Sequence, residues 1–146
     1  MMLADYLSRG RIQIDGSADS IEDAVLLAGG LLTAAGCAGP GYPQAMVQTV
    51  RELGDAAVMA PHTALPHAAF FLGGLRPAVA AVRLARPLDF GGPNGPVRLI
   101  LGFCGADGDS HMQVLSALAA FLSRPESVPA LLGAATAEDF YRVLCS

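Results

Sequence analysis

The sequence lacks the features that mark several large classes of protein. None of its 146 residues is lysine, and nine basic residues stand against thirteen acidic ones, giving a net charge of −4. The chain therefore has no basic footprint for nucleic acid. Charged residues make up 15% and hydrophobic residues 53% of the chain, a composition that supports a folded core and excludes a disordered segment. The length predicts one compact domain over residues 1–146.

Cysteine is also scarce, and signals for export or membrane insertion are missing. Cys37, Cys104 and Cys145 form no C-x-x-C pair, which argues against a disulfide framework or a thiolate zinc site and favours reduced cytosolic thiols. The first six residues lack the basic and apolar regions of a signal peptide. The longest apolar run, residues 24–38, contains three glycines and is too short to span a bilayer. We expect a cytoplasmic protein with no direct membrane insertion.

Two helices are predicted in the first third of the chain. Ser20 can cap a helix whose apolar face continues to Ala35, because its oxygen can accept the free amide of Asp23. Pro43 suits the first turn of a second helix, which Gly54 would end.

Later segments predict strands and a third helix. Ser110 and Gln113 form a capping-box pattern that would place His111 at the first position of that helix. Strands are expected over 56–60, 78–85 and 97–103, with an extended piece at 64–69 and a turn at 87–96. Short helices are expected over 3–8, after Pro125 and after Thr136. These elements predict an α/β fold with a small mixed β-sheet flanked by helices.

Three histidines are the clearest candidates for chemistry. Pro66 fixes its own φ and holds Leu65 extended, so His67 would have little backbone freedom, which suits a nucleophile that meets other proteins in a fixed pose. A turn carrying a solvated histidine is the alternative, and for His62 it is the favoured one. At a helix start, His111 would tend to be neutral and offer a ring N–H to an anion.

An arginine near the end of the second predicted helix is the remaining candidate. The guanidinium of Arg51 can hold a phosphoryl group through two parallel hydrogen bonds. Taken alone, Arg51 and His111 fit exposed helix residues without a special role better than they fit a site. The Asp residues of the loops show no pair at helical spacing that would suggest acid–base work.

In this order, Arg51, Pro66-His67 and Asp109-Ser110-His111 resemble the type-2 IIA domains of the bacterial sugar phosphotransferase system, the mannitol/fructose class. The similarity extends from about residue 24 to about residue 122. It centres on Ala60-Pro61 and on Ala64-Leu65-Pro66-His67-Ala68, and looks closest to the ascorbate-type branch. The chain departs from that branch at Ala69, where an arginine is usual, and at His62, where a small or apolar residue is expected.

This resemblance implies a phosphoryl carrier. His67 would accept phosphate from the carrier protein HPr and pass it to a IIB component, while His111 and Arg51 would hydrogen-bond the phosphoryl oxygens. No metal or organic cofactor is implied. Phe70 and Phe71 would offer apolar contacts to these partners or pack in the core.

Two other functions remain open at this stage. A regulatory IIA-like protein would be phosphorylated at His67 and would signal to a partner outside transport. A zinc hydrolase would use His62, His67 and His111, but the spacing of the first two and the absence of an H-E-x-x-H motif fit a metal site poorly.

Overall fold

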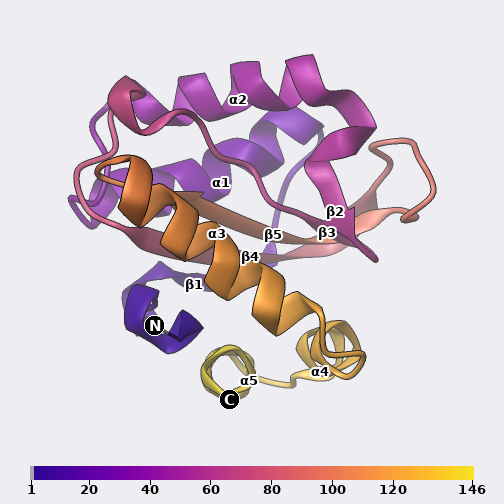
Figure 1. The fold of residues 1–146 in the computed structure, drawn as a ribbon. Coiled ribbons are helices and arrows are strands. Elements are labelled where there is room, and N and C mark those ends of the chain that lie inside the picture. The colour runs from indigo at the N-terminus through magenta and orange to yellow at the C-terminus, as the bar shows by residue number, and fades with distance from the viewer. Residues whose placement is uncertain (1) are drawn as a thin grey trace.

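The computed structural model describes residues 2–146 and contains a five-stranded mixed sheet between two layers of helices (Figure 1). The strand order is β1-β4-β5-β3-β2. The strands are β1 (Ile12–Gly16), β2 (Val58–Ala60), β3 (Thr63–Ala64), β4 (Ala78–Leu88) and β5 (Val97–Cys104). The β1–β4 and β3–β5 pairs are parallel, whereas the β4–β5 and β2–β3 pairs are antiparallel. The prediction of an α/β fold with a small mixed sheet is confirmed.

Two helices, α1 (Ile21–Ala34) and α2 (Tyr42–Leu53), cover one face of the sheet (Figure 1). Both begin and end as the sequence predicts. The Ser20 hydroxyl accepts a hydrogen bond from the Asp23 amide at 3.1 Å, and α2 ends where Gly54 adopts a left-handed φ of 59°. Their apolar stripes pack against one set of alternating strand residues, a buried layer that includes Ala78, Ala80, Val82 and Ile100.

The other face is covered by α3 (Gly108–Leu122), α4 (Ser127–Gly133), α5 (Ala137–Cys145) and the 3-10 turn η1 (Leu3–Tyr6) (Figure 1). Side chains alternate between the two faces of a strand, so this layer contacts the other half of the same strands. Its buried strand residues are Val79, Ala81, Leu99, Leu101 and Phe103. Phe103 thus lies beneath α3, where the chain leaves the sheet.

Several predicted boundaries were wrong, and one strand was not predicted. The strand expected over 56–60 begins only at Val58, because residues 54–57 form the 3-10 turn η3. The segment 3–8 is not one helix but begins with η1, which is followed by a second 3-10 turn at Arg9–Arg11. Strand β4 runs three residues beyond its predicted end, to Leu88. Strand β1 was not predicted, because its apolar–polar alternation is short and is broken at Asp15, which has a φ of 59°.

The start of α3 also differs from the prediction, and this changes the position of His111. The helix is capped by Asp107, whose Oδ1 accepts from the Ser110 amide at 2.7 Å while the Ser110 hydroxyl accepts from the Asp107 amide at 3.1 Å. His111 is therefore the fourth residue of the helix, and its amide is bonded to the Asp107 carbonyl. Only its side chain is available to a ligand. Among residues 2–146, no helix is both long and apolar enough to cross a membrane.

Candidate active site

His67 lies in the segment that follows β3 and is half-buried. Its Nδ1 is 2.8 Å from the carbonyl oxygen of Leu65, two residues earlier. Because a carbonyl oxygen can only accept, Nδ1 carries the proton in this hydrogen bond. The neutral ring then has its lone pair on Nε2, which makes Nε2 the nucleophilic atom.

His111 from α3 faces the same spot. The two imidazole centroids are 5.4 Å apart, with the rings tilted by 59°, so the structure brings together the two histidines that the sequence singled out. Burial, and secondarily the proximity of His67, lower the pKa of His111 below its ordinary value. Both effects favour the neutral imidazole. Its Nδ1 is buried without a hydrogen-bond partner among the described residues.

A third ring, that of Phe103, lies on the buried side of the two imidazoles. Phe103 is fully buried and stacks on His67 with centroids 4.5 Å apart and planes 24° apart. Its centroid is also 5.3 Å from that of His111. Phe103 is the last residue of the strand predicted over 97–103, but no local signal indicates that it contacts both histidines.

Tyr42, at the start of α2, ties the backbone next to His67 to β5. It is fully buried. Its hydroxyl accepts from the Ala68 amide at 3.0 Å and lies 2.9 Å from the Phe103 carbonyl and 3.1 Å from that of Ala68, to which it can donate. The Phe103 amide in turn donates to the Pro66 carbonyl at 3.2 Å. The sequence gave no reason to single out Tyr42, because these partners are 26 and 61 residues away.

Arg51 is not brought to this site. Its Nη2 donates to Glu22 of α1 at 2.9 Å, and it lines a cavity of about 390 Å³ between α1, α2 and Phe90. Tyr42 bonds to Ala68, next to His67, from the first turn of α2. Arg51 is nine residues further on, roughly 14 Å along the helix. The expected grouping of Arg51 with the two histidines is therefore absent here.

His62 is engaged in the loop between β4 and β5 rather than with the other histidines. Its Nδ1 donates to the Pro96 carbonyl at 2.8 Å, and its amide donates to the Asn94 carbonyl at 3.0 Å. Within the part of the chain that the structure describes, no three His, Cys, Asp or Glu side chains are grouped so that they could hold a metal ion.

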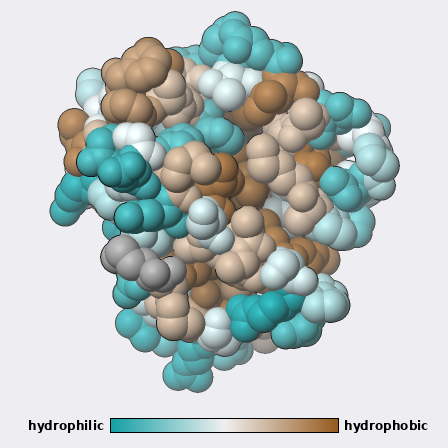
Figure 2. Space-filling model, in the orientation of Figure 1, coloured by the Kyte–Doolittle hydropathy of each residue, from teal (hydrophilic) through white to brown (hydrophobic). Residues whose placement is uncertain are grey.

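Large apolar side chains are exposed beside the two histidines. Phe71 is 74% exposed and Leu72 48%, both in η4 (Phe70–Leu72), and Met112 is 57% exposed directly after His111. Figure 2 shows hydrophobic residues gathered at the upper left, over η4. We call Phe71, Leu72 and Met112 the apolar rim. The partly buried Phe70 contacts Phe71 edge-to-face at 5.5 Å, which supports the ring of Phe71 on the surface.

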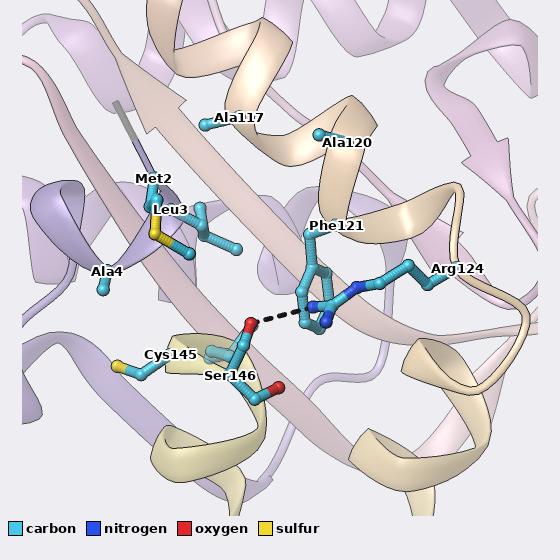
Figure 3. Close-up of a pocket in the computed structure, with 10 residues that line it drawn as sticks. Met2, Leu3, Ala4, Ala117, Ala120, Phe121, Arg124, Cys145 and Ser146 are labelled. Carbon is cyan, nitrogen blue, oxygen red and sulfur yellow. Dashed lines mark hydrogen bonds between the residues drawn. The ribbon is translucent and has the colours of Figure 1, made fainter.

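A separate cavity of about 290 Å³ lies between η1, α3 and α5 (Figure 3). Its walls are mainly apolar, and Arg124 donates to the Ser146 carbonyl at 3.0 Å on one side. No histidine is among its lining residues, so it is distinct from the imidazole pair.

Comparison with known proteins places this geometry in a family. Residues 5–146 match the family model described as "Phosphoenolpyruvate-dependent sugar phosphotransferase system, EIIA 2". The ascorbate-specific EIIA component of Shigella boydii serotype 4 is 33% identical over 116 residues, which cover 78% of this chain and 75% of that protein.

Solved structures agree with the sequence comparison. The solution structure of the mannitol-specific cryptic phosphotransferase enzyme IIA from Escherichia coli has a TM-score of 0.88 at 27% identity, covering 99% of this chain and 98% of that one. The mannitol enzyme IIA of E. coli, in complex with phosphorylated mannitol enzyme IIB, shares the fold with a TM-score of 0.83 at 21% identity, covering 95% and 96%. The chain belongs to the EIIA 2 family of the phosphoenolpyruvate-dependent sugar phosphotransferase system.

Proposed function

We propose that this protein is a cytoplasmic phosphoryl carrier of a sugar phosphotransferase system and that Nε2 of His67 is the acceptor atom. The observation that carries the proposal is the hydrogen bond from Nδ1 of His67 to the Leu65 carbonyl. This bond leaves the Nε2 lone pair free in a half-buried position beside His111. The reaction is nucleophilic catalysis by imidazole.

The phosphoryl group would move in two balanced steps. In the first, the Nε2 lone pair forms a bond to phosphorus while the bond from phosphorus to the donor breaks. The imidazole of His67 becomes cationic, and its Nδ1–H bond to Leu65 becomes charge-assisted and therefore stronger. In the second, an acceptor attacks phosphorus, the P–N bond breaks, and His67 returns to the neutral form.

His111 would stabilise the phosphoryl oxygens during both steps. Its lowered pKa keeps the ring neutral, so it can donate one N–H without adding a second cation beside His67. We place that proton on Nε2, because Nδ1 is buried without a partner and a buried donor without an acceptor is costly. Replacing His111 by Ala should slow transfer without removing the acceptor.

Arg51 has no place in the proposed site, since its guanidinium is paired with Glu22. The apolar rim is the proposed docking face for HPr and for a IIB component. Exposed aromatic and methionine side chains next to a reactive group are typical of interface cores. The complex of E. coli mannitol enzyme IIA with phosphorylated enzyme IIB provides a precedent within the fold.

The test is phosphate uptake from phosphoenolpyruvate in the presence of enzyme I and HPr. The wild-type protein and the variant His62→Gln should gain one acid-labile phosphate, whereas His67→Gln should gain none and keep its fold. His62 serves as the matched control because it precedes the acceptor by five residues and bonds to a different loop. Uptake by His67→Gln at the wild-type rate would refute the proposal.

A further inference from the structure

We propose that Phe103 is a positioning residue for phosphoryl transfer, a rigid aromatic wall that sets the gap between the rings of His67 and His111. Tyr42 fixes this wall to the backbone next to His67. This inference rests on the proposed function. It concerns one side chain that packs against both histidines and one that bonds to the backbone of Ala68, next to His67. Neither would itself touch the phosphoryl group.

The rings of Phe103, His67 and His111 form a compact cluster. Phe103 is 4.5 Å from His67 and 5.3 Å from His111, and the two histidines are 5.4 Å apart. Each ring therefore contacts the other two. The face of His67 that stacks on Phe103 cannot rotate into the sheet, because Phe103 is fully buried and fills that space. The ring can vary its orientation only toward His111 and solvent.

The backbone on both sides of His67 is also fixed to Phe103. The Phe103 amide donates to the carbonyl of Pro66, directly before His67. The Tyr42 hydroxyl joins the Phe103 carbonyl to the amide of Ala68, directly after His67. Burial raises the pKa of Tyr42, so its hydroxyl stays protonated and can both donate and accept.

The chemistry explains why such a wall matters. Effective transfer requires the reacting atoms within about 3–3.5 Å and aligned, and a displacement of about 1 Å can cost roughly a hundredfold in rate. The imidazole of His67 is held by one hydrogen bond, from Nδ1 to a backbone carbonyl. That hydrogen bond alone would leave the ring free to tilt about the line between Nδ1 and the carbonyl oxygen. The stacked Phe103 ring removes this freedom. Losing the ring should lower the rate of transfer without weakening the docking of HPr.

The test compares Phe103→Leu with Phe140→Leu. Both phenylalanines are fully buried in the same core layer, but among residues 2–146 only Phe103 packs its ring against the histidines. In single-turnover phosphoryl uptake from phosphorylated HPr, Phe103→Leu should lower the maximal rate constant (kcat) roughly tenfold or more, with an unchanged half-saturating concentration of phosphorylated HPr (KM). Phe140→Leu should keep the wild-type kcat.

A spectroscopic measurement accompanies the kinetics. The carbon-bound imidazole protons of His67 should move downfield in the NMR spectrum of Phe103→Leu, because the ring current of the stacked phenyl group is lost, and should stay in place in Phe140→Leu. Tyr42→Phe should also lower kcat and shift the Ala68 amide signal. If Phe103→Leu does not fold, Phe103→Met retains most of the volume without the ring and should show the same kinetic pattern.

The outcomes separate the two proposals. Equal kcat values for the Phe103 and Phe140 variants, alongside normal uptake by the wild type and none by His67→Gln, would overturn the positioning role and leave the proposed function intact. A wild-type protein that takes up no phosphate at all would overturn the proposed function, and the positioning role with it.

Discussion

At the scale of single residues, the roles that we propose for the two histidines differ because their environments differ. His67 has a hydrogen-bond acceptor for Nδ1, so its proton position is fixed and its lone pair points away from the backbone. His111 has no such partner for Nδ1 and is pushed toward the neutral form by burial and by its neighbour. These environments support the proposed roles of His67 as nucleophile and of His111 as neutral donor.

The lowered pKa of His111 has a consequence for stability. In the unfolded chain this imidazole titrates near its ordinary value of 6.5, and in the folded protein it titrates lower. As the pH falls through about 6.5, the unfolded state binds the proton first, so the free energy of unfolding should decrease. Urea unfolding at pH 8 and pH 5.5 should show a smaller pH effect in His111→Gln than in the wild type. Identical pH effects in the two proteins would contradict the burial argument.

The position of Arg51 also leads to a residue-scale prediction. The side chains of Arg51 and Glu22 are 60% and 42% exposed, and such ion pairs contribute about 0–1 kcal/mol. Arg51→Ala should therefore change the free energy of unfolding by less than about 1 kcal/mol and leave the rate of phosphate uptake unchanged. A large loss of uptake with retained binding of HPr would place the guanidinium back in the site.

At the scale of elements, the site depends on how closely η4 approaches the start of α3. Gly74 follows η4, and a Cβ added there would overlap the carbonyl oxygen of Gly105. A Cβ on Gly105 would in turn lie 2.6 Å from the amide nitrogen of His111. Gly74 and Gly105 therefore allow the chain after η4, the chain after β5 and the first turn of α3 to pack backbone against backbone. This packing brings α3 and His111 over the sheet.

Gly74→Ala tests this close approach. The overlap is with backbone, which cannot rotate away, so the substitution should lower the free energy of unfolding by about 1–3 kcal/mol and slow phosphate uptake by displacing α3. The matched control is Gly30→Ala in α1, where an added Cβ meets nothing within 4 Å. That variant should be more stable by roughly 0.5–1 kcal/mol. A Gly74 variant as stable as the Gly30 variant would show that the stacking is loose.

Local signals predicted most of the elements and fewer of the tertiary contacts. The caps at Ser20 and Gly54 are local in sequence, so α1 and α2 could be read directly. The start of α3 was predicted wrongly because Ser110 fits two capping-box patterns. It is the N-cap residue in the pattern with Gln113 and the third helical residue in the pattern with Asp107, and the structure has the second. Phe103 and Tyr42 could not be assigned to the site, since their partners come from distant segments and only the folded chain brings them together.

At the scale of the whole molecule, one end of the structure combines the imidazole pair with exposed apolar side chains. The apolar rim contributes Phe71 and Leu72 from η4 and Met112 from α3, so it draws on two separate elements. Exposed apolar residues grouped at a reactive site favour an interface more than scattered ones do. The same face would have to serve the phosphoryl donor and the acceptor in turn.

Phe71→Ser tests the docking role of this face. Phe71 is 74% exposed, so the substitution should leave the fold unchanged and raise KM for phosphorylated HPr, with little change in kcat. Met59→Ser is the control, because Met59 is 46% exposed on β2, away from η4, and should keep the wild-type KM. Equal KM values for the two variants would exclude Phe71 from the docking face.

The most direct measurement of the central claim is the identity of the phosphorylated nitrogen. The protein, labelled with ¹⁵N in its histidines, is phosphorylated through enzyme I and HPr, and the P–N coupling is observed by NMR. We expect one phosphorylated residue, His67, with phosphorus coupled to Nε2 and a protonated Nδ1 still bonded to the Leu65 carbonyl. Phosphorus on Nδ1 of His67, or on His62 or His111, would contradict it.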